Sequence, residues 1–190
     1  MSEGGFLTIS GGAIKAAEEA AENKMKVPET ARTGRDKEVR FWEEAGTITA
    51  AYSKKYTDTK TNTEVRVLTY EVACSADGSG ENVGFVIKNG LRFAPSAMAM
   101  GEPQNLAKMS FLSVNKLVGL LRALGFQGDQ PDGGYSQEML AALFPAEDAF
   151  GEMSALVNRT LRFEVRQAPT VGNDGQKRFF PEISKVFEVV

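Results

Sequence analysis

SFLSVNKLVGLLRALGF, residues 110–126, decides the fold, because every part of it predicts one helix. Its apolar residues recur at helical spacing and form a single stripe, made of Val114, Leu117, Val118, Leu121 and Leu124. Ser110 is a predicted N-cap, and Gly125 followed by Phe126 is typical of a Schellman-type helix end. The stripe needs an apolar partner, and the segments on both sides of the helix have the composition of β-strands.

Five strands and a second helix complete the predicted elements. The strands cover residues 46–56, 63–73, 83–93 with an interruption at Asn89-Gly90, 159–167 and 177–189. Residues 136–144 predict a short helix, capped by Ser136 and ended by Pro145. The order β-β-β-α-β-β is typical of the OB-fold, a five-stranded Greek-key barrel. The sequence therefore predicts a mainly β fold, with a helix between strands 3 and 4 that closes one end of an OB-like barrel.

An N-terminal arm precedes the predicted barrel. Residues 13–24 are rich in Ala, Glu and Lys and predict a helix, whose apolar face is mostly alanine. Val27-Pro28 ends this helix, and the charged residues 29–38 have the composition of a linker. We therefore expect two parts, an arm with a helix and linker at residues 1–38 and the barrel domain at residues 39–190.

The composition excludes several classes of enzyme. The 190 residues include no histidine and one cysteine, Cys74, so Ser-His-Asp, Cys-His and multi-cysteine metal chemistry are excluded. No cofactor motif is found, and we expect a protein that is not an enzyme and uses neither cofactor nor metal. No apolar run is long enough to span a bilayer, and the N-terminus MSEGGFLTIS lacks the features of a signal peptide. We therefore expect an intracellular, cytoplasmic protein without membrane contact.

Charge is unevenly distributed along the chain, although the net charge is only -3. Residues 125–155 contain six acidic and no basic residues, so the rest of the chain is net positive. We expect this acidic stretch to lie away from any bound nucleic acid, because it repels phosphates.

Basic and aromatic residues gather on the predicted hairpins. Single-stranded nucleic acid is bound by basic side chains that contact phosphates and by aromatic rings that stack on bases. The first and last hairpins supply both kinds, which gives the predicted nucleic-acid-binding set Tyr52, Lys54, Lys55, Tyr56, Arg66, Tyr70, Arg162, Arg166, Lys177, Arg178 and Phe180. A competing interpretation makes these cations solvated surface residues and these rings core residues. Tyr52 in particular shares its predicted face with Ile48 and Ala50.

Three segments carry a resemblance to a known family. They are the hairpin GTITAAYSKKYTDTKTNTEVRVLTYEV at residues 46–72, the helix SFLSVNKLVGLLRALGF, and the closing segment NRTLRFEVRQAPTVGNDGQKRFFPEISKV at residues 158–186. Together they resemble phage-encoded single-stranded DNA-binding proteins of the OB-fold type. The resemblance implies sequence-nonspecific protection of single-stranded DNA in replication or recombination, inside an infected or lysogenic bacterial host. It also implies homo-oligomers, and replication or recombination proteins as partners.

Two alternatives stay open from the sequence alone. A non-enzymatic β-barrel that serves as a structural, assembly or adaptor module, without nucleic-acid binding, is expected to present the same strands to neighbouring subunits. Stacking and phosphate contacts also serve RNA and DNA alike, so the predicted residues do not choose between the two.

Overall fold

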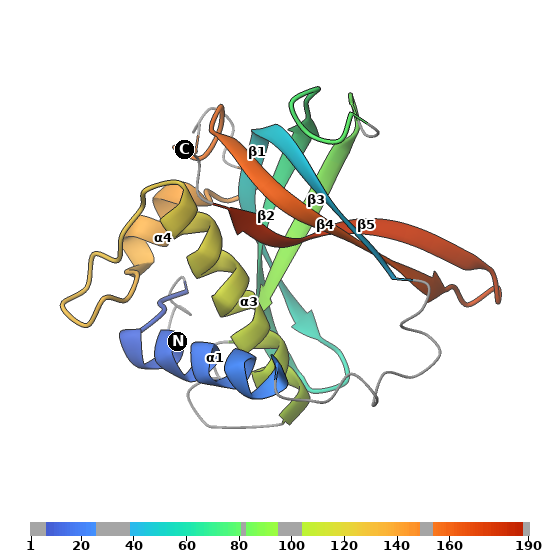
Figure 1. Ribbon diagram of the computed structural model, residues 1–190. Coiled ribbons are helices and arrows are strands. Elements are labelled where there is room, and N and C mark those ends of the chain that lie inside the picture. The colour runs from blue at the N-terminus through green and yellow to red at the C-terminus, as the bar shows by residue number, and fades with distance from the viewer. Residues whose placement is uncertain (1–6, 26–38, 81–82, 95–103, 149–153, 188–190) are drawn as a thin grey trace.

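Five antiparallel strands form one sheet in the order β3-β2-β1-β4-β5, and helices pack on one side of it (Figure 1). The computed structural model describes residues 7–25, 39–80, 83–94, 104–148 and 154–187. The strands are β1 (Arg40–Asp58), β2 (Thr63–Cys74), β3 (Val86–Phe93), β4 (Thr160–Val171) and β5 (Lys177–Phe187). The described helices are α1 (Gly11–Met25), α3 (Gln104–Ala123) and α4 (Gln137–Leu143). The prediction of a mainly β fold, with a helix between the third and fourth strands, is confirmed.

β1 is the central strand and belongs to both halves of the sheet. Its first part, Arg40–Thr47, pairs with β4, and its second part pairs with β2. The register to β2 shifts between Ile48 and Ala50, so Thr49 is an extra residue that forms a β-bulge. The bulge changes which face the following side chains occupy. Tyr52 therefore shares the outer face with Ala50 and not the buried face with Ile48, contrary to the alternation expected from the sequence.

The helix that decides the fold is α3, and its C-terminal end forms as predicted. Gly125 has a φ of 82°, and the N–H of Phe126 donates to the carbonyl of Leu121 at 2.8 Å, which is the Schellman arrangement. The start differs from the prediction. The helix begins at Gln104, so Ser110 lies inside it and is not its N-cap.

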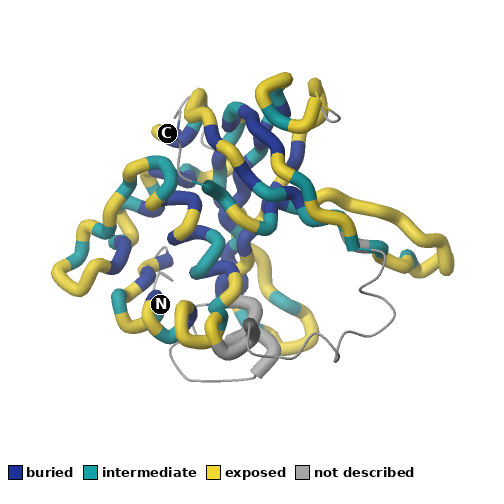
Figure 2. The backbone as a smooth tube through the Cα atoms, in the orientation of Figure 1, coloured by how far each residue is buried: buried dark blue, intermediate teal, exposed yellow. Residues whose placement is uncertain are grey.

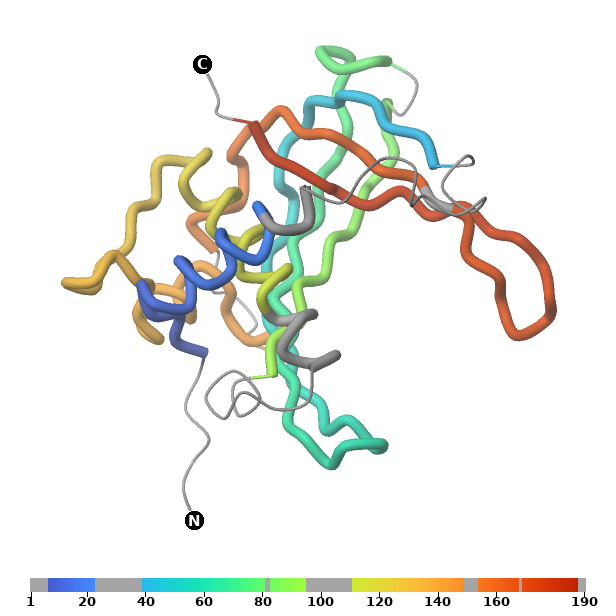
Figure 3. The backbone as a smooth tube through the Cα atoms, turned by 60° about the horizontal axis from the view of Figure 1, so that its bottom comes forward, coloured from blue at the N-terminus to red at the C-terminus, as the bar shows by residue number. Residues whose placement is uncertain are grey.

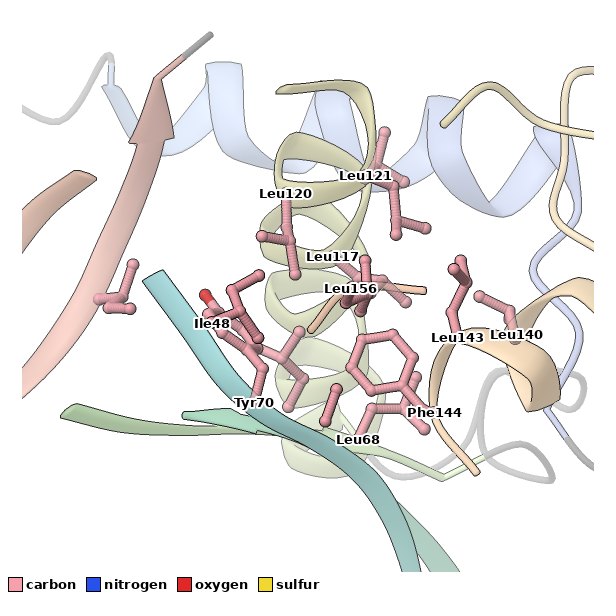
Figure 4. Packing of buried hydrophobic residues seen from close by; sticks show 14 of the residues in the cluster. Ile48, Leu68, Tyr70, Leu117, Leu120, Leu121, Leu140, Leu143, Phe144 and Leu156 are labelled. Carbon is pink, nitrogen blue, oxygen red and sulfur yellow. The ribbon is translucent and has the colours of Figure 1, made fainter. Parts of the chain in front are cut away.

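The apolar stripe of α3 is buried against the sheet and forms the centre of the core (Figure 2, Figure 4). Leu117, Leu120 and Leu121 are completely buried. Around them lie buried residues of β1, β2, α4 and the segment before β4, namely Ile48, Leu68, Tyr70, Leu140, Leu143, Phe144 and Leu156 (Figure 4). Full burial of one such side chain contributes about 1.5–3 kcal/mol relative to its exposure. The helix and the sheet therefore stabilise each other.

α4 follows the acidic loop and is capped as the sequence predicts. The hydroxyl oxygen of Ser136 accepts the N–H of Met139 at 3.1 Å, and Ser136 donates its own N–H to Asp129 at 2.7 Å. Leu140 and Leu143 are buried. The helix is therefore fixed to the core, together with the chain that leaves it.

α1 belongs to the same core, which corrects the expectation of a separate N-terminal arm. It packs against α3, and the side-chain amide of Asn115 donates to the carbonyl of Ala17 at 2.6 Å. Arg122 of α3 and Glu18 of α1 form an ion pair at 3.0 Å. The small alanine side chains that suggested a thin apolar face allow the two helices to approach closely. The linker predicted at residues 29–38 lies outside the described residues.

The sheet is open between its edge strands, β3 and β5. Their Cα atoms approach within 8 Å, but no strand pairing joins them among the described residues. α3 contacts both edges, and the hydroxyl oxygen of its Ser113 accepts the N–H of Arg92 in β3 at 3.0 Å. The closed five-stranded barrel therefore stays a prediction.

Candidate nucleic-acid interface

An open groove crosses the outer face of β1, β2 and β3. In the antiparallel register Lys54 pairs with Val67, and Val67 pairs with Arg92, so side chains from three strands share this face. The groove has a volume of about 430 Å³ and is lined by Lys54, Lys55, Tyr56, Val67, Thr69, Lys88, Gly90 and Arg92. Cations from two edges of the groove and an aromatic ring are the side chains that single-stranded nucleic acid requires.

Tyr52 contacts two of the lysines that line this groove. The Nζ atoms of Lys54 and Lys88 lie 5.6 Å and 5.2 Å from the centre of its ring, within the range of cation–π attraction. Its hydroxyl donates to Glu71 at 3.0 Å, and the same carboxylate lies 3.3 Å from Lys88. Contacts with Tyr52 first, and with Glu71 second, raise the pKa of Lys88 above its ordinary value. Lys88 therefore keeps its positive charge, and Tyr52 holds two lysines over the groove.

Tyr56 and Arg92 supply the more open part of the groove. Tyr56 is 42% exposed and comes two residues after Lys54 on the same strand. Arg92 is exposed and makes no side-chain ion pair with any residue that the structure describes. Gly90 lies between Lys88 and Arg92 on the exposed face of β3 and leaves this part of the sheet without a side chain. Gly90 pairs with Thr69, which pairs with Tyr52, so the space without a side chain lies in the row of Tyr52, next to the row that contains Lys54 and Arg92.

The β4–β5 hairpin carries the second predicted group of residues and projects away from the helices (Figure 1, Figure 3). Arg162, Lys177 and Arg178 are exposed. Arg178 pairs with Asp174 at 2.6 Å, and Arg166 pairs with Glu182 at 2.8 Å. After Gln167, which pairs with Arg40, β4 pairs only with β5 among the described residues. Lys177 and Arg178 therefore lie on a ribbon two strands wide, whereas Arg162 and Arg166 lie where β1, β4 and β5 are paired.

Aromatic side chains on the same hairpin are unusually exposed. Phe180 is 59% exposed and its neighbour Phe179 is 49% exposed. Successive residues of a strand point to opposite faces, so each face of the ribbon carries one phenylalanine. Rings in this position can stack on bases or cover another apolar surface.

Two predicted binding residues, Arg66 and Tyr70, are buried, and the structure corrects their assignment. Tyr70 is 1% exposed and its hydroxyl accepts a hydrogen bond from Asn89 at 2.8 Å. Burial raises the pKa of Tyr70. Arg66 is 9% exposed and pairs across the sheet with Phe93, on the face that includes Tyr70. A base cannot stack on a core ring, so these two residues are not part of the interface described here.

Lys88 and Arg92 line the groove but were absent from the predicted set. β3 was expected to break at Asn89-Gly90, yet the strand runs without interruption from Val86 to Phe93. Buried and exposed residues alternate strictly along it. The alternation of the apolar residues Ile87, Leu91 and Phe93 indicates a continuous strand. The polar Asn89 interrupts this alternation in the sequence, although its side chain is buried and donates to the hydroxyl of Tyr70.

The acidic stretch reaches the groove, which corrects the expectation that it lies elsewhere. A carboxylate oxygen of Glu147 lies 2.7 Å from the Nζ atom of Lys54. A second lysine that lines the groove, Lys55, lies 3.7 Å from Glu64. Both contacts are exposed ion pairs, which salt and competing anions weaken easily.

Comparison with known proteins gives no relative for this chain. No family model, curated protein or solved structure matches the chain. None of the described helices is long and apolar enough to cross a membrane. Within the described part of the chain, no group of three or more acidic or cysteine side chains is placed to hold a metal ion.

Proposed function

We propose that this protein binds single-stranded DNA without sequence preference, along the groove on β1, β2 and β3. The observation that carries the proposal is that Lys54, Lys88 and Arg92, from two different strands, line one groove together with the exposed ring of Tyr56. Protection of single strands in phage-type replication or recombination is the role that the resemblance in the sequence adds to this chemistry.

Each part of the groove has a chemical task in this proposal. Lys54, Lys88 and Arg92 contact phosphates, and Tyr56 stacks on a base. Tyr52 positions the two lysines, since both ammonium groups already lie over its ring. Every base has a π-face, so stacking on Tyr56 gives affinity without base selection.

A finer description of the fold belongs to the same proposal. In a five-stranded OB barrel, the face of strands 2 and 3 and the loops after strands 1 and 4 bind oligonucleotides. The groove and the β4–β5 hairpin correspond to these positions. The strand order also makes β3 and β5 the strands that must meet in such a barrel, and these two edges approach each other. This correspondence supports an OB-like barrel that uses both regions.

Fluorescence anisotropy of a labelled oligo-dT tests the proposal, with a duplex of equal length and an oligo-rU as comparisons. We expect tight binding to the single strand only, weakening steeply with salt because each neutralised phosphate contributes about 0.7 to the log–log slope. Binding to oligo-rU as well would extend the function to RNA. Absence of binding at low salt contradicts the proposal.

A second function, an assembly module, is favoured by the exposed apolar side chains of the β4–β5 hairpin. Val171, Phe179 and Phe180 are between 49% and 63% exposed, and exposed apolar groups of this kind mark protein contacts. Light scattering distinguishes the two functions. A salt-resistant oligomer that dissociates when Phe179 and Phe180 are both changed to Ser, in a protein without nucleic-acid affinity, supports the assembly module.

A further inference from the structure

A short acidic segment lies along the free edge of β1, directly beside the groove. β4 pairs with β1 only as far as Thr47, and in the described part of the chain no other strand pairs with this side of the second part of β1. Residues 145–147 occupy this edge. The N–H of Ser53 donates to the carbonyl of Pro145 at 2.8 Å, and the N–H of Glu147 donates to the carbonyl of Ser53 at 3.2 Å.

The backbone pairing places a carboxylate on a cation of the groove. Glu147 lies 2.7 Å from Lys54, and the two side chains are 51% and 47% exposed. The segment is anchored by the completely buried Phe144 on one side. After residues 149–153, the buried Ser154 donates its hydroxyl to the carbonyl of Leu143 at 2.5 Å. The position of Glu147 is therefore determined by the backbone and the core, and the exposed ion pair adds little to it.

We propose that Glu147 is an internal competitor that occupies Lys54 until a phosphate displaces it. This regulation of the groove rests on the proposed function. A carboxylate and a phosphate are both attracted to the positive charge of Lys54, and two anions held at one ammonium group repel each other, so a phosphate gains less from Lys54 while Glu147 stays paired with it. When the phosphate takes Lys54, Glu147 loses its partner and is left close to a second negative charge. Binding is therefore weaker than the groove alone allows, and bound strands are released more readily.

The two carboxylates that pair with groove lysines, Glu71 and Glu147, differ in their other contacts. Lys88 has a carboxylate partner of its own, Glu71, which also accepts the hydrogen bond of the Tyr52 hydroxyl. Among the residues that the structure describes, the side chain of Glu147 forms an ion pair with Lys54 alone. It is thus the carboxylate whose removal frees a groove cation without disturbing Tyr52.

The test compares two variants that remove one negative charge each. Glu147→Gln removes the competitor, and Glu138→Gln removes an exposed carboxylate from the same acidic stretch, on α4. Titration of labelled oligo-dT at low salt is expected to show about 2- to 5-fold tighter binding for Glu147→Gln than for Glu138→Gln. The difference should shrink as salt rises, because exposed ion pairs are screened. In a Lys54→Gln background, Glu147→Gln should have no effect.

Each outcome separates this inference from the function on which it rests. Equal affinities of the Glu147→Gln and Glu138→Gln variants overturn the competitor, while binding by the unchanged protein still supports the function. A gain from Glu147→Gln that persists in the Lys54→Gln background also overturns it, because the effect then does not act through Lys54. Binding by the Glu147→Gln variant alone supports both the single-stranded DNA-binding function and the competitor role of Glu147. Failure of every variant to bind overturns both.

Discussion

The groove on β1, β2 and β3 and the hairpin of β4 and β5 carry the same kinds of side chain but hold them differently. In the groove, Lys54 and Lys88 come from different strands and both lie over Tyr52. On the hairpin, Arg178 pairs with Asp174 four residues before it, at the end of a ribbon that only two strands form. Cations of both regions form ion pairs, but only in the groove do two cations from different strands also share one aromatic ring.

This difference assigns separate roles to the two regions. Side chains gathered by a paired sheet need little further ordering when a ligand arrives, so less conformational entropy is lost on binding. Exposed side chains on a narrow ribbon must be ordered by the ligand itself, which reduces the net gain. We therefore expect the groove to provide most of the affinity and the hairpin to extend the contact.

The largest effect is expected when three positive charges are removed from one region at a time. Lys54→Gln, Lys88→Gln and Arg92→Gln together should weaken oligo-dT binding by about 100-fold at low salt and lower the salt slope by about 2. The matched hairpin variant, with Arg162, Lys177 and Arg178 changed to Gln, should lose about 10-fold. Anisotropy titrations at several salt concentrations measure both values. Circular dichroism should show unchanged folds, and a larger loss for the hairpin variant reverses the comparison.

Removal of one aromatic ring should weaken oligo-dT binding less than removal of three charges, and the two regions should differ less in this effect. Tyr56→Ala is expected to weaken binding by about 10-fold, within the range of about 1–3 kcal/mol for one stacked base. Phe180→Ala should cost about 3-fold, because the ribbon must be ordered first. Equal losses would show that both rings stack equally well.

Tyr70→Phe is the matched control for the aromatic variants, because Tyr70 is a core ring. The change removes the hydroxyl that accepts from the buried Asn89. It should lower the free energy of unfolding by about 1–3 kcal/mol, measured by urea denaturation, and leave the affinity for oligo-dT unchanged.

Local patterns predicted the elements of this fold well, and the reasons are physical. The Schellman end at Gly125 and the N-cap at Ser136 depend on neighbours within a few residues, so the sequence alone contains them. The strands follow from short alternating runs in the same way. The packing of α1 on α3 was not predicted, because it depends on a contact between Ala17 and Asn115, far apart in the chain.

The candidate site was predicted in part, and the features that the prediction missed depend on contacts between strands. The bulge at Thr49 changes the face of every later residue of β1, and nothing in the local composition marks it. Asn89 hides the alternation of β3 because its polar side chain is satisfied by Tyr70 only in the folded core. Sequence reasoning thus found Lys54 and Tyr56 but omitted Lys88.

The smallest effect concerns pH and sharpens the role of Tyr52 within the groove. The pKa of Lys88 is raised, first by its contact with Tyr52 and then by Glu71, so the proton stays on Lys88 as pH rises past the ordinary lysine value. Tyr52→Phe keeps the ring but removes the hydroxyl that contacts Lys88 and Glu71. The pKa of Lys88 should then fall toward its ordinary value, and its charge should be lost at lower pH.

Affinity for oligo-dT measured from about pH 7 to about pH 11 tests this reasoning, because the variant loses the charge of Lys88 only near the ordinary lysine pKa. Near neutral pH the Tyr52→Phe variant should bind within about 2-fold of the unchanged protein, since Lys88 is charged in both. With rising pH the variant should lose affinity first, because its Lys88 deprotonates earlier. A Lys88→Gln background removes the titrating group, so the two pH profiles should coincide there. Profiles that still differ in that background would place the effect on another group, and Tyr52 would then act on the groove through its ring alone.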